Sequence, residues 1–173
     1  MRRWRSEAGT QNRVLGSPKG GPKGEVRVEV ELLNYAERAM VDRGLLDLDK
    51  VTRLLVTGVV DTGATNSVLP RDVALRLGVL SQTTEEVIVA GGQIVTVPIT
   101  QVVEFRALGR HAMEECIVMG EEVLLGQFFL EQTDLFVDSK NKRLIGNPDH
   151  PAGRVLKVRR STRRRSATIG AER

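Results

Sequence analysis

The first regular pattern along the chain is an alternation of apolar and polar residues. Val26, Val28, Val30 and Leu32 are separated by charged residues, and Asn34 ends the pattern. A period of two is typical of a β-strand with one buried face. Further β-branched or apolar runs lie at residues 51–60, 87–90, 94–99, 102–108, 111–119, 123–125, 135–137 and 143–145. Many short strands of this kind predict a mainly β domain.

Two short helices are expected among these strands. Pro70 is suited to open the first, which has Val73, Ala74 and Leu77 on one face and Gly78 as its stop. The second is expected over residues 127–132. Residues 35–50 are charged and only loosely periodic, so they are interpreted as a long connection with one helical turn around residues 36–43.

Glycines mark the expected hairpin turns. Gly91-Gly92 separates two β-branched runs and has the composition of a tight turn that needs positive φ. A second hairpin is expected around Gly109-Arg110, between residues 102–108 and 111–119.

The ends of the chain differ from its middle. Residues 1–24 are expected to form a flexible, basic lead-in rich in Gly and Pro. The folded domain is expected over residues 25–149, and residues 150–173 are expected to form a basic disordered tail. Net charge is +4 over residues 1–25, −7 over residues 26–150 and +7 over residues 151–173. Nucleic acid is therefore expected to bind only through the tails, if it binds, because the domain itself is acidic.

The remaining composition narrows the class of protein. Cys116 is the single cysteine, which excludes an internal disulfide, and it is interpreted as a small buried apolar thiol. The N-terminus does not resemble a secretory signal and no apolar run is long enough for a bilayer, so we expect a soluble, cytoplasmic protein without a membrane partner. His111 and His150 have no carboxylate or cysteine at ligand spacing, so no metal site and no cofactor are expected.

The candidate chemistry lies at Asp61-Thr62-Gly63, directly after an apolar strand. One interpretation is structural: Asp61 caps its own backbone in a turn and Gly63 adopts positive φ. The other interpretation is catalytic, with Asp61 as a carboxylate that hydrolyses a peptide. This chemistry needs two carboxylates that share one proton. The sequence has no second Asp-Thr-Gly or Asp-Ser-Gly. A two-fold dimer that brings Asp61 against its own copy would supply the second carboxylate.

Three landmarks in this order resemble the retropepsin-like aspartic proteases, in particular their small bacterial members. They are the apolar pair before Asp61-Thr62-Gly63-Ala64, the hairpin Ala90-Gly91-Gly92-Gln93, and Leu124-Leu125-Gly126 before a helix. The resemblance covers residues 26–148. It implies an all-β, single-domain closed barrel with one or two short helices, active as a symmetric homodimer. The long segment 35–50 and both tails depart from the compact viral enzymes.

The resemblance also implies roles for single residues. Asp61, Thr62 and Gly63 would form the catalytic loop, with Thr62 bonding across the two-fold axis and the Gly63 amide donating to the carboxylates. The flap that binds substrate would contain Ala90, Gly91, Gly92 and Gln93, and residues 124–126 would pack beneath the catalytic loop. Phe128 and Phe129 are interpreted as core residues.

The favoured hypothesis is an aspartic endopeptidase that uses general acid/base chemistry without a cofactor. Its substrate would be an extended peptide or protein segment, bound as a strand between the flaps and the floor of a dimeric cleft. One alternative is a non-catalytic dimeric binding module of the same fold. A second is a nucleic-acid-associated protein that acts through its tails, favoured by Arg159-Arg160 and Arg163-Arg164-Arg165. For the C-terminal tail, a disordered solubilising segment is the competing interpretation.

Overall fold

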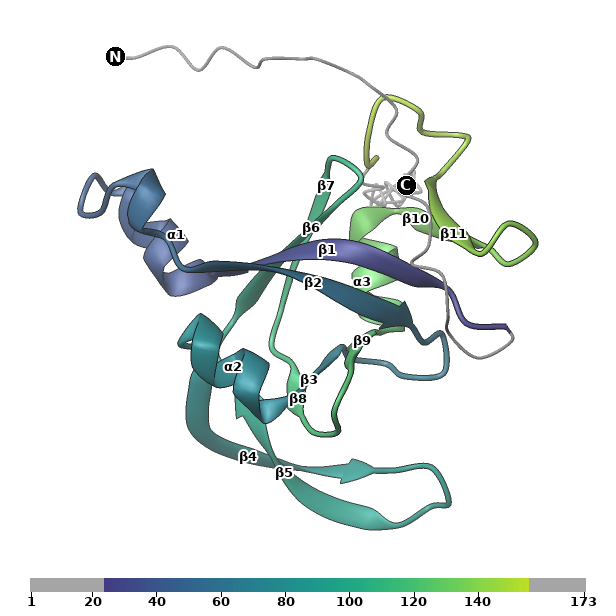
Figure 1. Ribbon diagram of the computed structural model, residues 1–173, viewed down its shortest axis with the longest axis horizontal. Coiled ribbons are helices and arrows are strands. Elements are labelled where there is room, and N and C mark those ends of the chain that lie inside the picture. The colour runs from purple at the N-terminus through teal and green to yellow at the C-terminus, as the bar shows by residue number, and fades with distance from the viewer. Residues whose placement is uncertain (1–23, 156–173) are drawn as a thin grey trace, which may run out of the picture.

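The computed structural model describes residues 24–155, so most of both basic tails lies outside it. The described part is mainly β, as the alternating pattern predicts (Figure 1). In chain order its elements are β1 (Arg27–Asn34), α1 (Tyr35–Asp42), the 3-10 turn η1 (Leu48–Lys50), β2 (Arg53–Val60), β3 (Val68–Leu69), α2 (Arg71–Leu77), β4 (Leu80–Ile88), β5 (Ile94–Thr100), β6 (Val103–Ala107), β7 (Arg110–Glu114), β8 (Ile117–Val118), β9 (Val123–Leu125), α3 (Gln127–Thr133), β10 (Leu135–Asp138) and β11 (Arg143–Gly146).

Nine of these strands form one sheet, in the order β4-β5-β8-β3-β9-β2-β1-β6-β7. The sheet curls into a half-barrel with β4 and β7 at its two ends (Figure 1). The remaining strands, β10 and β11, form a separate antiparallel hairpin next to α3. Most neighbouring strands are antiparallel, but β9 runs parallel to β2, and β8 runs parallel to β3.

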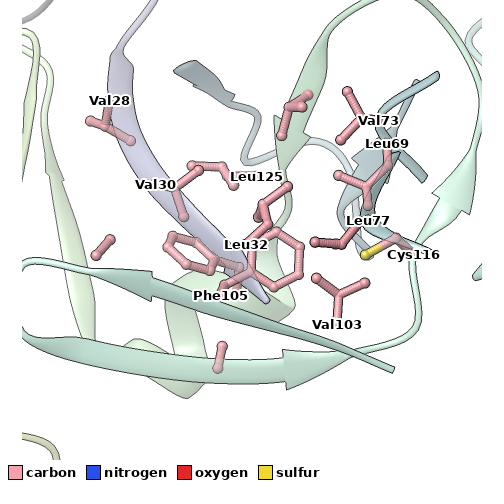
Figure 2. Close-up of a cluster of buried hydrophobic side chains, with 14 of the residues drawn as sticks. Val28, Val30, Leu32, Leu69, Val73, Leu77, Val103, Phe105, Cys116 and Leu125 are labelled. Atoms are coloured by element: carbon pink, nitrogen blue, oxygen red, sulfur yellow. The ribbon is translucent and has the colours of Figure 1, made fainter. Parts of the chain in front are cut away.

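The predicted alternation of β1 is confirmed. Val26, Val28, Val30 and Leu32 are at most 7% exposed, and β1 pairs with β2 on one side and with β6 on the other. The buried face of β1 therefore lies at the centre of the core. Figure 2 shows this core, in which Leu32, Phe105 and Leu125 come from three different strands.

Two further predictions about the core have different outcomes. Cys116 is fully buried and its sulfur points into the apolar cluster, so it is an apolar core thiol (Figure 2). Phe129 is fully buried and its ring lies 5.7 Å from that of Phe105, but Phe128 is 40% exposed. The prediction that both phenylalanines are core residues is wrong for Phe128, because adjacent residues of a helix point about 100° apart.

Helix α2 matches its prediction in detail, and α1 lies where a helical turn was expected. Val73, Ala74 and Leu77 form the buried face of α2, and Gly78 ends it at φ 72°. The helical turn expected around residues 36–43 is the eight-residue helix α1, which begins at Tyr35 and has Asn34 as its N-cap. None of the residues of α1 is buried, so the helix leaves no apolar period in the sequence.

The first predicted hairpin is longer than expected, and one of the two runs expected to form the second hairpin is divided into two strands. Gly91 and Gly92 have φ of 98° and 82°, as predicted, but β4 already begins at Leu80. The run 111–119 is divided between β7 and β8, because the chain leaves β6 after Glu114 and pairs with β3 and β5 instead. Within residues 24–155, no helix is both long and apolar enough to cross a membrane.

Candidate active site

The loop that contains Asp61 is held by the segment where β9 passes into α3. The main-chain amide of Asp61 donates a hydrogen bond to the carbonyl oxygen of Leu125 at 3.0 Å. In the opposite direction, the amides of Gln127 and Phe128 donate to the carbonyl oxygens of Ala64 and Thr65 at 2.8 and 3.0 Å. Three main-chain bonds thus fix the start and the middle of the loop.

Gly126 is the contact point between these two segments. A Cβ atom at this position would lie 2.6 Å from the carbonyl carbon of Asn66 and 2.9 Å from the carbonyl oxygen of Thr65. Such distances leave no room for a side chain, and backbone atoms cannot turn aside. The prediction that residues 124–126 pack beneath the Asp61 loop is therefore confirmed, and the close approach explains the glycine.

The carboxylate of Asp61 is half-buried, and its Oδ1 atom accepts a hydrogen bond from the amide of Gly63 at 2.9 Å. This is the bond expected from both interpretations of the motif. Gly63 does not have positive φ, however, so its conformation is not the one expected for a purely structural turn. A Cβ at Gly63 would lie 3.2 Å from Asp61 Oδ1, which is tighter than ordinary contact.

Asp61 lies on the wall of a cleft of about 800 Å³. Part of the lining comes from Asp61 and residues 63–66 of its loop, and another part comes from residues 87–90 of the long hairpin formed by β4 and β5, which we call the hairpin arm. Of the predicted site residues, Asp61, Gly63 and Ala90 line this cleft. Sequence reasoning missed its apolar lining, which consists of Val68, Val87, Ile88, Val89, Ile117, Met119 and Leu124.

The other predicted site residues lie outside the cleft lining. Gly91, Gly92 and Gln93 are exposed at the tip of the hairpin, where the amide of Val89 donates to the carbonyl oxygen of Gln93 at 2.9 Å. Thr62 is exposed as well, and it borders a different hollow together with α3 and β10. The roles expected for these four residues stay predictions.

The arm of the hairpin carries exposed aliphatic side chains. Ile88 and Ile94 are direct cross-strand partners and are 75% and 65% exposed. Figure 1 shows β4 and β5 as a long hairpin that extends from the body of the sheet. A signal for Ile88 was present in the sequence, because it precedes the glycine turn within a β-branched run.

One histidine is less isolated than its sequence neighbours indicate. His150 Nδ1 lies 2.6 Å from Asp134 Oδ2, and the side-chain amide of Asn147 contacts both residues. Asp134 is 16 positions away from His150, so spacing along the sequence did not reveal this carboxylate partner. Across residues 24–155, no group of three or more His, Cys, Asp or Glu side chains is arranged to hold a metal ion.

The curled β-sheet thus carries Asp-Thr-Gly on a loop that packs on an apolar-Gly-helix segment and borders a cleft. Residues 52–132, a little under half of the chain, match the family model described as gag-polyprotein putative aspartyl protease. The family model and the motifs of the sequence agree, so the resemblance to the retropepsin-like aspartic proteases is confirmed.

Several solved structures are similar to the chain. The retroviral protease-like domain of Ddi1 from Leishmania major has 22% identity and a TM-score of 0.41, covering 55% of this chain and 81% of that one. The retropepsin-like aspartic protease from Rickettsia conorii has 16% identity and a TM-score of 0.40, with coverage of 66% and 85%. The EIAV protease in complex with the inhibitor HBY-793 has 26% identity and a TM-score of 0.37, with coverage of 44% and 75%. A search of curated proteins found no match.

Proposed function

We propose that the chain is one subunit of a homodimeric aspartic endopeptidase, in which two copies of Asp61 hydrolyse a peptide bond with an activated water. The observation that carries this proposal is the position of Asp61 on the wall of the cleft of about 800 Å³, together with Ile88 and Ala90 of the hairpin arm. A mainly apolar cleft with a few polar groups is the usual form of a binding site. The match to the aspartyl protease family supports the same function.

The mechanism needs a second carboxylate, which a second copy of the chain would supply. Two carboxylates a few ångströms apart hold one proton between them, because like charges at that distance do not both ionise. The ionised Asp61 would take a proton from the attacking water, while the protonated Asp61 would give its proton to the carbonyl oxygen of the substrate. When the tetrahedral intermediate collapses and its C–N bond breaks, the Asp61 that took the proton from water would give it to the amine nitrogen, and the other Asp61 would take a proton back from a hydroxyl of the intermediate.

Residues next to Asp61 indicate which face the second copy would cover. Thr62 borders a hollow of about 490 Å³ together with Leu130, Phe136 and Val137. Phe136 is 49% exposed there, although it is a large apolar side chain. In the proposed dimer this face meets its own copy, so that each Thr62 can bond to the partner loop and each Phe136 leaves water.

The proposed substrate is an extended peptide. The cleft lies between the Asp61 loop and an exposed hairpin arm, and β4 is the terminal strand of the nine-stranded sheet. An extended peptide can bind beside such an arm as an added strand, with alternate side chains entering apolar pockets. Ile88, Ile117 and Met119 would give those pockets an apolar character.

A mixed peptide library, incubated with the full chain and read by mass spectrometry, tests the proposal. We expect the wild-type protein to cut and the Asp61→Asn variant to leave the library intact at equal protein concentration. A non-catalytic binding module of the same fold would give no cut peptides with either protein, and both proteins would retain the same bound peptides. That second result would sink the enzymatic proposal.

A further inference from the structure

Glu114, the last residue of β7, is a buried carboxylate with an exposed fraction of 4%. Both of its oxygens accept hydrogen bonds from one residue, Ser67. The Ser67 hydroxyl donates to Oε1 at 2.7 Å, and the Ser67 main-chain amide donates to Oε2 at 3.1 Å. Burial raises the pKa of Glu114, and the two bonds from Ser67 oppose that rise. Burying a carboxylate is costly unless its oxygens are satisfied, so its use here needs a reason.

Ser67 also receives a hydrogen bond. The main-chain amide of Gly126 donates to Ser67 Oγ at 3.1 Å. A hydroxyl has one proton and two lone pairs, so Ser67 can donate to Glu114 and accept from Gly126 at the same time. The three residues form one chain of bonds in which every donor has an acceptor. These hydrogen bonds join β7 to the point where β9 passes into α3.

The position of Ser67 connects these hydrogen bonds to the loop that contains Asp61. Ser67 closes the loop that begins at Asp61, and it is fully buried, whereas the preceding residues Thr65 and Asn66 are exposed. The loop also lies directly against Gly126 at Asn66. A shift of Ser67 would therefore move Asn66 against a backbone with no free space, and the strain would pass along the short loop to Asp61.

A carboxylate satisfies both donors of Ser67 in this arrangement, and an amide does not. Ser67 presents two donors to Glu114, an N–H and an O–H, and a carboxylate offers acceptors to both. A glutamine offers one oxygen and one NH₂ group. If its oxygen accepts from the Ser67 amide, its NH₂ group faces Oγ, and the hydroxyl proton of Ser67 loses its acceptor. The substitution changes a single atom, yet it breaks the direction of the bond chain.

We propose that Glu114 is a positioning residue of the active site, which acts through Ser67 to fix the loop that presents Asp61. Glu114 does not touch the reacting atoms in this proposal. The effect on catalysis rests on the proposed endopeptidase function, whereas the effect on the loop does not. The two effects are therefore measured separately.

The first measurement is amide hydrogen exchange, residue by residue, on the full chain. We compare the wild-type protein with Glu114→Gln and with Ser67→Ala, and we use Glu115→Gln as the matched control, since Glu115 is the exposed neighbour. We expect exchange at Gly63 and Gly126 to be about tenfold faster in the first two variants, as follows from the loss of one buried hydrogen bond. Exchange at Val30, in the centre of β1, should stay unchanged in all of them.

The second measurement separates kcat from KM for a cleaved peptide, at a protein concentration where light scattering shows dimers. A misplaced Asp61 should lower kcat by about tenfold to a hundredfold and change KM little. The double variant Glu114→Gln/Ser67→Ala should be no worse than Ser67→Ala alone, because Glu114 acts through Ser67. Glu115→Gln should cleave at the wild-type rate.

The outcomes are distinct. Wild-type exchange at Gly63 in both folded variants, or multiplicative losses in kcat in the double variant, would overturn the positioning role. If the wild-type protein does not cleave peptides, the endopeptidase proposal fails and exchange alone decides the inference. If Glu114→Gln does not fold, the comparison rests on Ser67→Ala, and unchanged exchange at Gly63 in that variant overturns the proposal.

Discussion

The main-chain amide of Asp61 and the carbonyl oxygen of Leu125 are joined by a hydrogen bond of 3.0 Å. This bond connects the end of β2 to the end of β9, which runs parallel to it. The next residue, Gly126, has no room for a side chain because Asn66 covers it. Two motifs that lie far apart in the sequence therefore form one structural unit, and a substitution in one is expected to disturb the other.

The substitution Gly126→Ala is expected to damage the Asp61 loop from beneath. Its methyl group would meet the backbone of Asn66 at 2.6 Å, so the loop must move away. We expect a loss of about 1–3 kcal/mol in the free energy of unfolding, together with loss of peptide cleavage. In the comparison variant Gly58→Ala, the methyl group meets only side-chain atoms of Leu125, so its effect on cleavage should be smaller. Chemical denaturation and cleavage assays on both variants check this order.

The dependence of peptide cleavage on pH, together with the Asp61→Asn variant, gives the most direct test of the proposed pair of Asp61 carboxylates. If two copies of Asp61 share one proton, cleavage needs the singly protonated pair, so the pH–rate profile should be bell-shaped. Asp61→Asn should remove nearly all turnover, because an amide cannot take a proton from water. The near-isosteric variant should still form dimers and should keep its melting temperature. A lower melting temperature with no change in turnover would favour a purely structural turn instead.

The two glycines of the hairpin tip provide a test of the flap. Gly91 and Gly92 have φ of 98° and 82° and no neighbour within contact distance of an added Cβ, so Gly→Val at both strains the backbone without a clash. The expected cost is about 1–3 kcal/mol per residue, confined to the hairpin. Turnover should fall while the melting temperature of the domain stays similar. Gly109→Val, at φ 73° in the β6–β7 turn, is the matched control and should keep its turnover. Equal kinetics in all three proteins would show that the tip has no part in catalysis.

The pair Asp134 and His150 predicts a specific dependence of stability on pH. The pKa of Asp134 is lowered, first by the hydrogen bond from Asn147 and then by His150 and Arg110. Because the folded value lies below the unfolded one, the ionised carboxylate stabilises the fold above about pH 4, and this stability is lost as pH falls further. Asp134→Asn should therefore melt at a lower temperature at neutral pH and should lose less stability on acidification.

Asparagine is a suitable replacement because residue 134 has φ 53°, a conformation that asparagine tolerates. The exposed neighbour Asp149→Asn is the control and should follow the wild-type melting curve. Melting temperatures measured between about pH 7 and pH 2 for the three proteins check the prediction. Parallel curves for the wild type and Asp134→Asn would contradict it.

The C-terminal tail is expected to be dispensable for cleavage. Deletion of residues 152–173 removes a net charge of +7 but keeps His150, whose carbonyl oxygen accepts a hydrogen bond from Arg110 at 2.9 Å. We expect unchanged peptide cleavage and much weaker binding to nucleic acid or heparin. In a second, full-length variant, the five arginines within residues 159–165 are replaced by serine. This variant keeps the length of the tail but loses most of its charge, so it separates the effect of charge from the effect of length. Loss of cleavage by a folded truncation would instead make the tail part of the enzyme.

Local patterns in the sequence predicted the elements that bury one clear face. Val26 to Leu32 alternate because one side of β1 faces the core, and α2 is bounded by Pro70 and Gly78. The middle of β4 left no such pattern, because residues 82–86 are exposed on both faces of the hairpin arm. α1 has no buried residue, but a signal was present: Asn34 caps it by accepting from the amide of Glu37 at 3.2 Å.

Contacts between distant segments could not be predicted in this way. Periodicity describes the direction of a side chain relative to its own backbone, and it says nothing about which other segment lies opposite. Ser67 and Glu114 are 47 positions apart, and Asp134 and His150 are 16 apart. The same limit applies to the cleft, since its lining combines residues of the Asp61 loop, of β4 and of β8.

Because Cys116 is buried, its reaction with a thiol reagent can report transient opening of the core. Thiol reagents attack the thiolate, and burial raises the pKa of this thiol well above its ordinary value while the core closes access to the sulfur. Cys116 is the single cysteine of the sequence, so any labelling has one origin. A reagent such as a maleimide should therefore react only in molecules whose core has opened. The labelling rate at fixed pH would measure how often each variant opens, without any substrate or enzymatic activity.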